Sequence, residues 1–417
     1  MQAKLNETIQ ELFPKYLTFL SRLVRIPSLI GYEKYAQSFV AESMKEIGLK
    51  IDAFEIDPEL LKNHPQFVQD DRSYKNRPIV VGNLKGSENG RSLIMNAHCD
   101  TAPAGDLRDW IHDPFCGEIH DGKLYGRGAW DDKAGIAVML LICESLIKAK
   151  VPIKGDLIFQ SVIEDEVTGN GTLACLERGY TASNAIILDG TWAERIIDAH
   201  MGQVWFRVEI LGRSAPACSS FRGENPIYHV DAILKSFQRL VSDKNSKAKP
   251  WGLVENPNFI NVGKITSGAW PGSVPVRCIL ECQAGFCPPQ TIADIKEEIV
   301  ACLMEVSRND SWLRDNPLKI NFFGLSVDPV IAPLVNPVTD GILIAVKNSQ
   351  GKEALVTPVT GHGDIRHFYN HSIPACFYGP GEGKNAHVEN EYYVISEMPV
   401  VAQNIANYIL SLWNLGV

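Results

Sequence analysis

The 417-residue sequence contains no run of 18 or more apolar residues, which excludes an ordinary membrane-spanning helix. Its first residues, MQAKLNETIQ, lack the basic and then apolar pattern of a secretory signal, and we therefore expect a cytoplasmic location. Basic residues are outnumbered, with 40 Lys and Arg against 49 Asp and Glu and a net charge of -9. Without a basic surplus to neutralise phosphates, we expect neither a nucleic-acid nor a membrane partner.

The ten cysteines include no CxxC pair and have no zinc-ribbon spacing, which argues against a metal-thiolate site. Scattered cysteines of this kind are typical of small core residues in a reducing compartment. Hydrophobic residues make up 45% and charged residues 21% of the chain, as in an ordinary globular protein. A chain of this length exceeds what one core usually supports, so we expect two domains and chemistry on small molecules or peptides.

Short apolar strands alternate with helices from residue 93 to residue 188, and the same rhythm returns after about Ser326. The segment 133–150 is apolar nearly all round, which indicates a buried helix. This order predicts an α/β fold with a doubly wound sheet covered by helices on both faces. Ligands of such a sheet bind at the C-terminal ends of the strands.

A different pattern occupies the middle of the chain. The segment 203–211 alternates strictly, and the side chains on one of its faces are Val204, Phe206, Val208 and Ile210. A strand of this kind belongs to a sheet with one exposed side. Two amphipathic helices, 227–241 and 292–306, accompany further strand-like stretches. We therefore expect an α+β domain over residues 202–325, inserted into a catalytic domain formed by residues 1–201 and 326–417.

Five segments place an acid or an imidazole beside glycine or at the end of a predicted strand. They are HCD with His98 and Asp100, GRGAWDDKAG with Asp131, IEDEVTGNG with Asp165 and Glu166, LDGT with Asp189, and GPGEGKNAH with His387. Taken alone, His98 is better interpreted as a structural histidine. Asp131 requires either a metal ion or Lys133 to compensate its burial. The acids of residues 164–166 repel one another unless a cation lies among them or they point into water.

Carboxylates combined with two imidazoles and no thiolate suit Zn²⁺, with Co²⁺ or Mn²⁺ as alternatives. Two such ions sharing a carboxylate would polarise a carbonyl group and lower the pKa of a bridging water. The donor set therefore points to a hydrolytic centre with two divalent metal ions.

The order of these segments resembles the M20 family, and in particular its acetylornithine deacetylase/succinyl-diaminopimelate desuccinylase branch. The shared pattern is HxD, GRGxxDxK, an acidic run followed by GxG, an acid-x-Thr, and GPGxxxxxH followed by Glu391. WIHDPFCGEIHDGKLYGRG and NVGKI extend the likeness over essentially the whole chain. Six ordered motifs over about 300 residues make chance agreement very improbable.

The resemblance implies a role for each of these residues. Asp131 would bridge two metal ions, His98 and Asp189 would complete one metal site, and Glu166 and His387 would complete the other. Asp100 would support His98, and Asp165 would be the general base, a position that the family usually fills with Glu. The resemblance also implies a cis peptide between Asp131 and Asp132, and an inserted domain that acts as a lid and joins two chains in a homodimer.

At two positions of the expected lid, this sequence lacks the residue that is usual in the family. The lid histidine that stabilises the oxyanion is replaced by Pro216, and the arginine that binds the substrate carboxylate is replaced by Gly285. His362, in the glycine-rich TGHGDIR turn, is a candidate to replace the missing donor, although a surface-turn histidine is an equally good interpretation. Asn261 of NVGKI is a candidate substrate contact. Arg366 is a candidate anion anchor, with a solvated arginine as the alternative.

We therefore expect a metal-dependent amidohydrolase that removes an acyl group from an N-acyl amino acid or cleaves a small peptide. The alternative is an M20 scaffold with lost or redirected hydrolysis, such as an enzyme that forms or rearranges an amide. The shortened base Asp165 and the replacement of the lid histidine by Pro216 motivate this alternative, because loss of one oxyanion donor typically costs a factor of about 10² to 10³ in rate.

Overall fold

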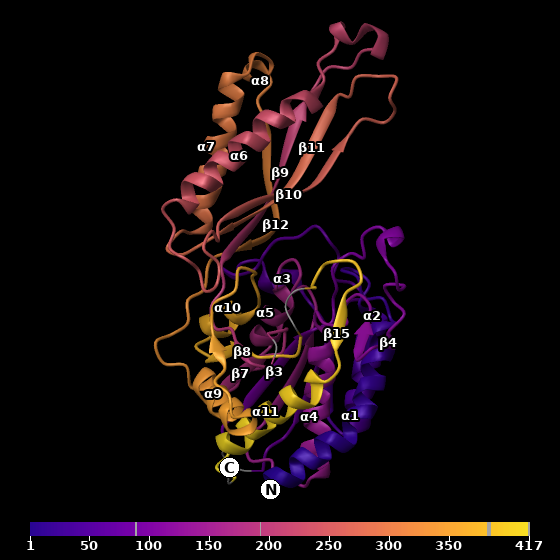
Figure 1. Ribbon diagram of the computed structural model, residues 1–417, viewed down its shortest axis with the longest axis vertical. Helices are drawn as coiled ribbons and strands as arrows, with labels where there is room; N and C mark the ends of the chain where they lie inside the picture. Colours follow the sequence, from indigo (N-terminus) through magenta and orange to yellow (C-terminus); the bar gives the residue numbers. More distant parts are fainter. Residues whose placement is uncertain (88–89, 192, 382–384, 416–417) are drawn as a thin grey trace. The chain divides into compact units, whose positions relative to one another are not determined.

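The computed structural model describes residues 1–87, 90–191, 193–381 and 385–415. Contacts within the chain define two compact units (Figure 1). Unit 1 comprises Met1–Asp198, Ala332–Thr357 and Gly363–Val417, and unit 2 comprises Ala199–Ile331 and Pro358–His362. The fold class is confirmed: an α/β unit is interrupted in sequence by an α+β unit.

A six-stranded sheet forms the centre of unit 1, in the order β1-β2-β6-β3-β7-β14. Its strands are β1 (Lys50–Glu55), β2 (Pro78–Leu84), β6 (Leu157–Val162), β3 (Leu93–His98), β7 (Asn184–Ile187) and β14 (Ala375–Phe377). Strands β6, β3, β7 and β14 run parallel, whereas β1 and β2 are antiparallel to their neighbours. The carboxyl ends of four parallel strands therefore lie at the same edge of the sheet.

Helices cover both faces of this sheet. The helices of unit 1 are α1 (Gln2–Val24), α2 (Lys34–Ile47), α3 (Pro58–Leu61), α4 (Lys133–Lys148), α5 (Asn170–Glu177), α9 (Pro337–Gln350), α10 (Ile365–Asn370) and α11 (Glu397–Leu412). Met95 of β3 packs in the core together with side chains of α1, α4 and α11. The next residue, Asn96, donates a hydrogen bond to Thr172 of α5. Because successive strand residues point to opposite faces, α4 and α5 lie on opposite sides of the sheet.

Helix α4 is buried because almost every position along it is apolar, as its sequence predicted. Asp132 caps its first turn by accepting a hydrogen bond from the Gly135 amide at 3.2 Å. The helix contacts α1, α11 and β3. This packing holds the start of α4, and with it the Asp131–Asp132 segment, against the edge of the sheet.

Unit 1 is completed by short elements. These are β4 (Glu118–His120), β5 (Lys123–Tyr125) and β15 (Tyr392–Val394) in one small sheet, β8 (Arg195–Ile196) and β13 (Leu355–Val356) in another, and the 3-10 helix η1 (Leu107–Asp109). None of the helices within the described ranges is both long and apolar enough to cross a membrane.

Unit 2 is built on an antiparallel sheet in the order β10-β11-β9-β12. Its elements are β9 (Gly202–Leu211), β10 (Phe259–Ser267), β11 (Arg277–Phe286), β12 (Lys319–Val327), α6 (Val230–Asn245), α7 (Ile292–Asn309), α8 (Ser311–Asp315), η2 (Ala217–Arg222) and η3 (Pro226–His229). The four alternating apolar residues of β9 are buried together with Ile233 and Phe237 of α6 and Ile299 and Leu303 of α7. The prediction of a sheet with one covered and one exposed face is therefore confirmed.

The contact-based units differ from the domains expected above mainly at residues 358–362. We assigned these residues to the catalytic domain, whereas they group with unit 2. The reason is local hydrogen bonding: the Val359 amide donates to the Ala199 carbonyl at 3.0 Å, and the Trp251 indole donates to the Val359 carbonyl at 2.9 Å.

Candidate metal centre

The parallel strands of unit 1 place acidic and imidazole side chains at one edge of their sheet. His98 is the last residue of β3, the acidic run of residues 164–166 follows β6, and Asp189 follows β7. His387 lies in the segment after β14, of which residues 382–384 are outside the described residues. Groups far apart in the sequence meet here because the strands that carry them run in the same direction.

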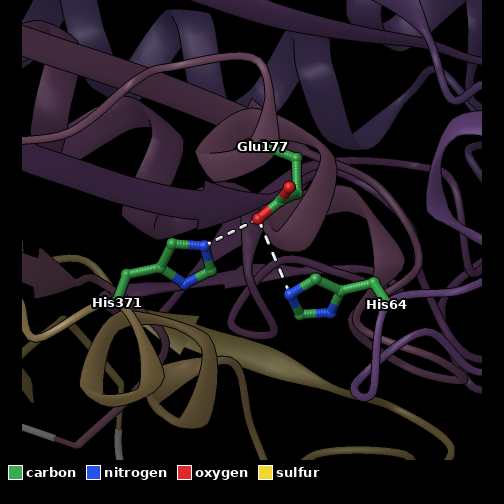
Figure 2. A group of neighbouring side chains, drawn as sticks. All are labelled: His64, Glu177 and His371. Atoms are coloured by element: carbon green, nitrogen blue, oxygen red, sulfur yellow. Dashed lines mark hydrogen bonds and ion pairs between the residues drawn. The ribbon is translucent and has the colours of Figure 1, made fainter.

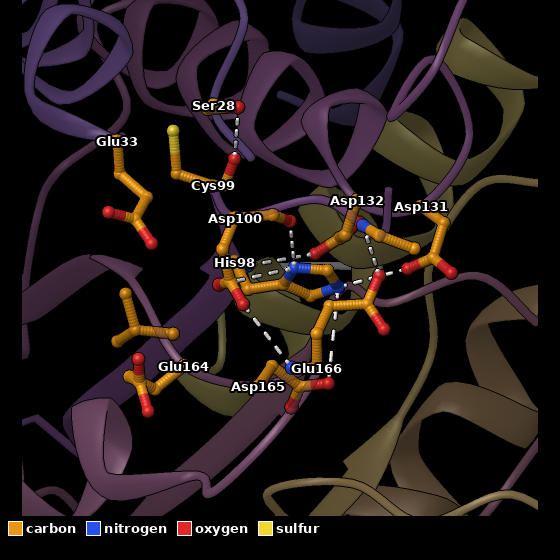
Figure 3. Close-up of polar contacts among 12 residues, drawn as sticks. Ser28, Glu33, His98, Cys99, Asp100, Asp131, Asp132, Glu164, Asp165 and Glu166 are labelled. Atoms are coloured by element: carbon orange, nitrogen blue, oxygen red, sulfur yellow. Dashed lines mark hydrogen bonds and ion pairs between the residues drawn. The ribbon is translucent and has the colours of Figure 1, made fainter. Parts of the chain in front are cut away.

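Asp131 lies between two imidazole rings. Its Oδ1 atom is 3.0 Å from Nε2 of His98, and its Oδ2 atom is 3.1 Å from Nε2 of His387. Figure 3 shows His98, Asp131 and the acidic run converging on the same region. One carboxylate thus faces two potential ligands, which is the arrangement required of a residue that bridges two metal ions.

The remaining candidate ligands fall into two groups around Asp131. Nε2 of His387 lies 2.8 Å from Oε2 of Glu166, and the potential donor atoms of Asp131, Glu166 and His387 are all within 4.8 Å of one another. The donor atoms of His98, Asp165 and Asp189 form a second group of the same size. The two pairs that the family resemblance assigns to separate ions therefore lie in separate groups.

Asp100 orients the site mainly through its backbone. Nδ1 of His98 donates to the Asp100 carbonyl oxygen at 2.9 Å, whereas the Asp100 carboxylate is 3.6 Å from this nitrogen. The carboxylate instead accepts a hydrogen bond from the Glu166 amide at 3.3 Å. With Nδ1 committed as a donor, Nε2 of His98 presents its lone pair to the centre.

The loop that carries Asp131 is held by Glu391. One oxygen of Glu391 accepts hydrogen bonds from the amides of Trp130 at 3.1 Å and Asp131 at 3.3 Å, and the other accepts from Arg127 at 2.7 Å. Burial raises the pKa of Glu391 to about 7. The sequence marked Glu391 only as part of the His387 motif, and this bracing role follows from the fold.

The ammonium group of Lys133 contacts backbone carbonyls rather than the Asp131 carboxylate. The Asp131–Asp132 peptide is cis, as expected, and Asp132 accepts a hydrogen bond from the His98 amide at 3.1 Å. The Lys133 ammonium donates to the carbonyls of Leu23 at 3.1 Å and Ile26 at 2.9 Å. Lys133 is thus engaged elsewhere, so the compensation of Asp131 must come from the imidazoles or from a bound cation.

The electrostatics of the centre favour a bound cation. Burial raises the pKa of Asp189 to about 7 and the pKa of Asp165 well above its usual range. The charge of Glu166 is the main cause that raises the pKa of His387 to about 11. Burial would raise the pKa of Asp131 as well, but the two imidazoles outweigh it and hold this pKa below its usual range. Carboxylates crowded in this way become stable as anions when a cation lies among them.

Glu164 does not point into water, although a solvated position was one of our interpretations. It is fully buried, and its carboxylate forms ion pairs and hydrogen bonds with Arg77 and Thr168. Arg77 also donates to Glu33 at 2.8 Å. This network fixes the residue before Asp165. It could not be predicted from the sequence, because Glu33 and Arg77 lie far upstream.

Arg366 is buried and engaged rather than solvated. Its guanidinium donates to the carbonyls of Gly363 and Thr168, both at 2.8 Å. Gly169 is required next to it, because a Cβ atom there would lie 1.9 Å from Nη2 of Arg366, and the backbone φ of +69° also disfavours other residues. The neighbouring Asp364, which we did not single out, is buried, and after burial its charge is the next cause of the raised pKa of Asp165.

The remaining predicted site residues belong to unit 2. Asn261 is an exposed residue of β10, opposite Gln283 in the register. Nδ1 of His362 lies 3.1 Å from Oε1 of Gln203. Pro216 forms an isolated bridge with Ser273 in the segment before η2. The predicted roles of Asn261 and His362 toward substrate stay predictions.

Gly285 lies against the side chain of a neighbouring aromatic residue, which would have to move to admit a side chain at this position. A Cβ atom at this position would lie 2.2 Å from the Phe259 ring of the paired strand β10. The position that carries an arginine in the family pattern is therefore filled by an aromatic ring from the neighbouring strand.

Comparisons with known proteins place these features in a family. Residues 94–411 match the sequence profile described as "Peptidase family M20/M25/M40". The chain is 28% identical to N-formyl-4-amino-5-aminomethyl-2-methylpyrimidine deformylase of Bacillus subtilis (strain 168), over 99% of this chain and 96% of the relative. It is 25% identical to succinyl-diaminopimelate desuccinylase of Methylorubrum populi, over 92% of this chain and 94% of that relative.

Solved structures support the fold. A di-peptidase from Saccharomyces cerevisiae superimposes with a TM-score of 0.80 at 15% identity, over 99% of both chains. At this identity, the likeness bears on the architecture alone.

Proposed function

Since this chain belongs to peptidase family M20/M25/M40, we propose that it is an amidohydrolase that removes a small acyl group from an amine at a centre with two divalent metal ions. Hydrolysis of an amide C–N bond, the expected reaction class, is common to the deformylase and the desuccinylase that this chain resembles. The alternative of a scaffold redirected away from hydrolysis is not favoured by these relatives. The position of Asp131 between His98 and His387 is the observation that carries the proposal.

In this proposal, Asp131 is shared between two sites, which His98 and Asp189 complete on one side and Glu166 and His387 on the other. Nitrogen and carboxylate donors of this kind fit Zn²⁺, and Co²⁺ or Mn²⁺ are the next best. When bound, two such ions supply a polarised carbonyl and a water of lowered pKa. Asp165 lies with its Oδ2 atom 4.0 Å from Nε2 of His98, close enough to take a proton at the centre and return it to the leaving amine.

The substrate we favour has no carboxylate beside the scissile amide. Gly285 stands where the family pattern has an arginine for that carboxylate, and the Phe259 ring fills the space. An N-formylated aminopyrimidine, as named for the deformylase relative, lacks such a carboxylate. An N-acyl amino acid or small peptide, the class expected from the sequence, is the second candidate, and the likeness to the desuccinylase supports the N-acyl amino acid.

The experiment compares the initial rates of zinc-reconstituted protein on three substrates. They are N-formyl-4-amino-5-aminomethyl-2-methylpyrimidine, N-succinyl-diaminopimelate and a dipeptide. We expect kcat/KM to be highest for the formylated pyrimidine. A higher value for either carboxylate-bearing substrate would reject the substrate class but keep the amidohydrolase. Absence of turnover on all three, with both metal ions bound, would reject hydrolysis as the function.

We also propose that two chains associate through unit 2, as the family resemblance implies. Strand β10 lies at the end of its sheet and pairs only with β11 among the described strands, so its outer edge can accept a second strand. Ile265 on this strand is 53% exposed. We expect Ile265→Glu to lower the molecular mass in light scattering from that of a dimer to that of a monomer. Leu60→Glu, at an exposed leucine of α3, is the control and should leave the mass unchanged.

A further inference from the structure

A second group of potential ligands lies in unit 1, apart from the residues of the candidate metal centre. It consists of His64, Glu177 and His371, which we call the His64 cluster. His64 follows the short helix α3, Glu177 is the last residue of α5, and His371 directly follows α10. Figure 2 shows the two imidazole rings directed at the same carboxylate oxygen. Three segments remote in sequence therefore meet at one point.

The distances suit a small cation. Nε2 of His371 lies 2.9 Å and Nε2 of His64 lies 3.6 Å from Oε1 of Glu177, and all three donor atoms are within 4.8 Å of one another. Ligands bound to one tetrahedral Zn²⁺ at about 2.0 to 2.1 Å are separated by roughly 3.3 Å. Small side-chain movements therefore suffice, and Glu177, with 40% of its side chain exposed, is free to make them.

His371 is already oriented as a ligand. Its Nδ1 atom is 2.7 Å from the His367 carbonyl oxygen, which can only accept, so Nδ1 carries the proton. In the neutral ring, Nε2 then presents a lone pair to the Glu177 carboxylate, which is also an acceptor. Two acceptors at 2.9 Å require either a second proton on the ring or a bound cation between them. A backbone carbonyl behind the ring and a carboxylate in front of it are the usual surroundings of a metal-binding histidine.

His64 is the weaker ligand of the three. Its Nδ1 atom accepts a hydrogen bond from the Gln66 amide at 3.2 Å, so the neutral ring carries its proton on Nε2, toward Glu177. A metal ion at Nε2 requires the other tautomer, in which the proton has moved to Nδ1. This change costs the long hydrogen bond from the Gln66 amide and releases no net proton from the neutral ring.

We propose that His64, Glu177 and His371 form an additional divalent-cation site that takes Zn²⁺ or Ni²⁺ and fastens the segment after α3 to the ends of α5 and α10. Two imidazoles and one carboxylate are the donors that these borderline ions prefer, and water can fill the fourth position. A ligand that binds only the folded chain stabilises it, so the cation raises the unfolding temperature. The site stands independently of the proposed catalytic function.

A similar trio, His112, Glu118 and His120, provides a matched control. All three residues lie in one segment of nine residues, and the side chains of Glu118 and His120 are each 51% exposed. The His112 ring packs on Tyr125 with a centroid distance of 4.4 Å. Because this trio joins no distant segments, a cation there would order little of the fold.

The test counts zinc in the full-length protein. Metal-stripped wild type, His64→Ala/His371→Ala and His112→Ala/His120→Ala are saturated with Zn²⁺ at pH 7.5, passed over a desalting column and analysed by mass spectrometry. We expect the His64/His371 variant to hold one zinc fewer per chain than wild type, and the His112/His120 variant to match wild type. Equal zinc in wild type and the His64/His371 variant would overturn the proposal, as would loss confined to the other variant.

Thermal unfolding provides a second readout, independent of retention on a column. We expect added Ni²⁺ to raise the unfolding temperature of wild type by several degrees more than that of the His64/His371 variant, with both measured against their metal-free forms. If the double variant is unfolded without metal, Glu177→Gln, which keeps the shape of the side chain, replaces it in both measurements. An identical Ni²⁺ shift in wild type and variant would refute the site.

Discussion

Nε2 of His98 lies 3.0 Å from Oδ1 of Asp131, and this contact joins the end of strand β3 to the start of the buried helix α4. The strand end positions the imidazole, and helix α4 positions the carboxylate. Neither element forms a site alone. The candidate metal centre is thus a property of the packing between β3 and α4.

Asp131→Asn should remove the charge that both proposed sites share. We expect loss of at least one metal ion per chain and a fall in kcat/KM of about 10³ or more, since metal ions supply several kcal/mol of transition-state stabilisation. Elemental analysis and initial rates measure the two effects. Asp340→Asn in the first turn of α9 removes an exposed carboxylate of the same kind and should retain both metal and activity.

Variants of Asp165 should affect proton transfer without affecting metal binding. We expect Asp165→Asn to lower kcat by about 10² to 10⁴ while the metal content changes little, because loss of a positioned base costs this much. Asp165→Glu, which restores the usual family residue, should stay active. If Asp165→Asn instead loses a metal ion together with activity, Asp165 acts as a ligand in the His98 group rather than as the base.

Arg77→Met should destabilise the fold strongly. Arg77 is buried between Glu33 and Glu164, and its removal leaves Glu33 buried without a counter-charge and Glu164 with only the more distant Arg72, at 4.0 Å. Such a change typically costs about 3 to 5 kcal/mol of unfolding free energy. Urea unfolding of the metal-free protein measures it. Arg108→Met removes the exposed partner of Asp106 and should give an unfolding curve indistinguishable from wild type.

Lys133 should give stability a characteristic pH dependence. Burial lowers the pKa of Lys133 to about 8, so between this value and the unfolded value near 10.5 the unfolded chain binds the extra proton. Because of Lys133, the free energy of unfolding therefore rises as the pH increases from about 8 to 10.5. This gain is lost as the pH falls back to 8. Relative to Lys133→Met, the wild type should gain about 3 kcal/mol between pH 8 and pH 10.5. A difference that stays constant with pH in urea titrations would contradict the shift.

The broad architecture follows from the sequence because it depends on repeated patterns. The strict alternation around Phe206 predicted a sheet with one covered face, and the all-apolar segment after Lys133 predicted a buried helix. Likewise, each candidate ligand follows a strand or precedes a buried helix. Hydrophobic periodicity and the positions at strand ends can be recognised in short stretches of sequence, and the folded chain retains both.

What could not be predicted depends on contacts between distant segments. The Arg77 to Glu164 ion pair spans 87 residues, and the burial of Arg366 depends on the Thr168 carbonyl. Asp100 supports His98 through a carbonyl group, which every residue has, so its side chain carried no information about this role. Such partners become visible only when the chain is folded.

Unit 1 is discontinuous, and this has a consequence for synthesis of the chain. His98, Asp131 and Glu166 are made first, then the whole of unit 2, and only then His387 and Glu391. Domains usually fold in the order in which they leave the ribosome. Here the inserted unit can fold while the surrounding one still lacks β14, β15 and the candidate ligand His387. A chain that ends before His387 therefore lacks part of the candidate metal centre, even if unit 2 has folded.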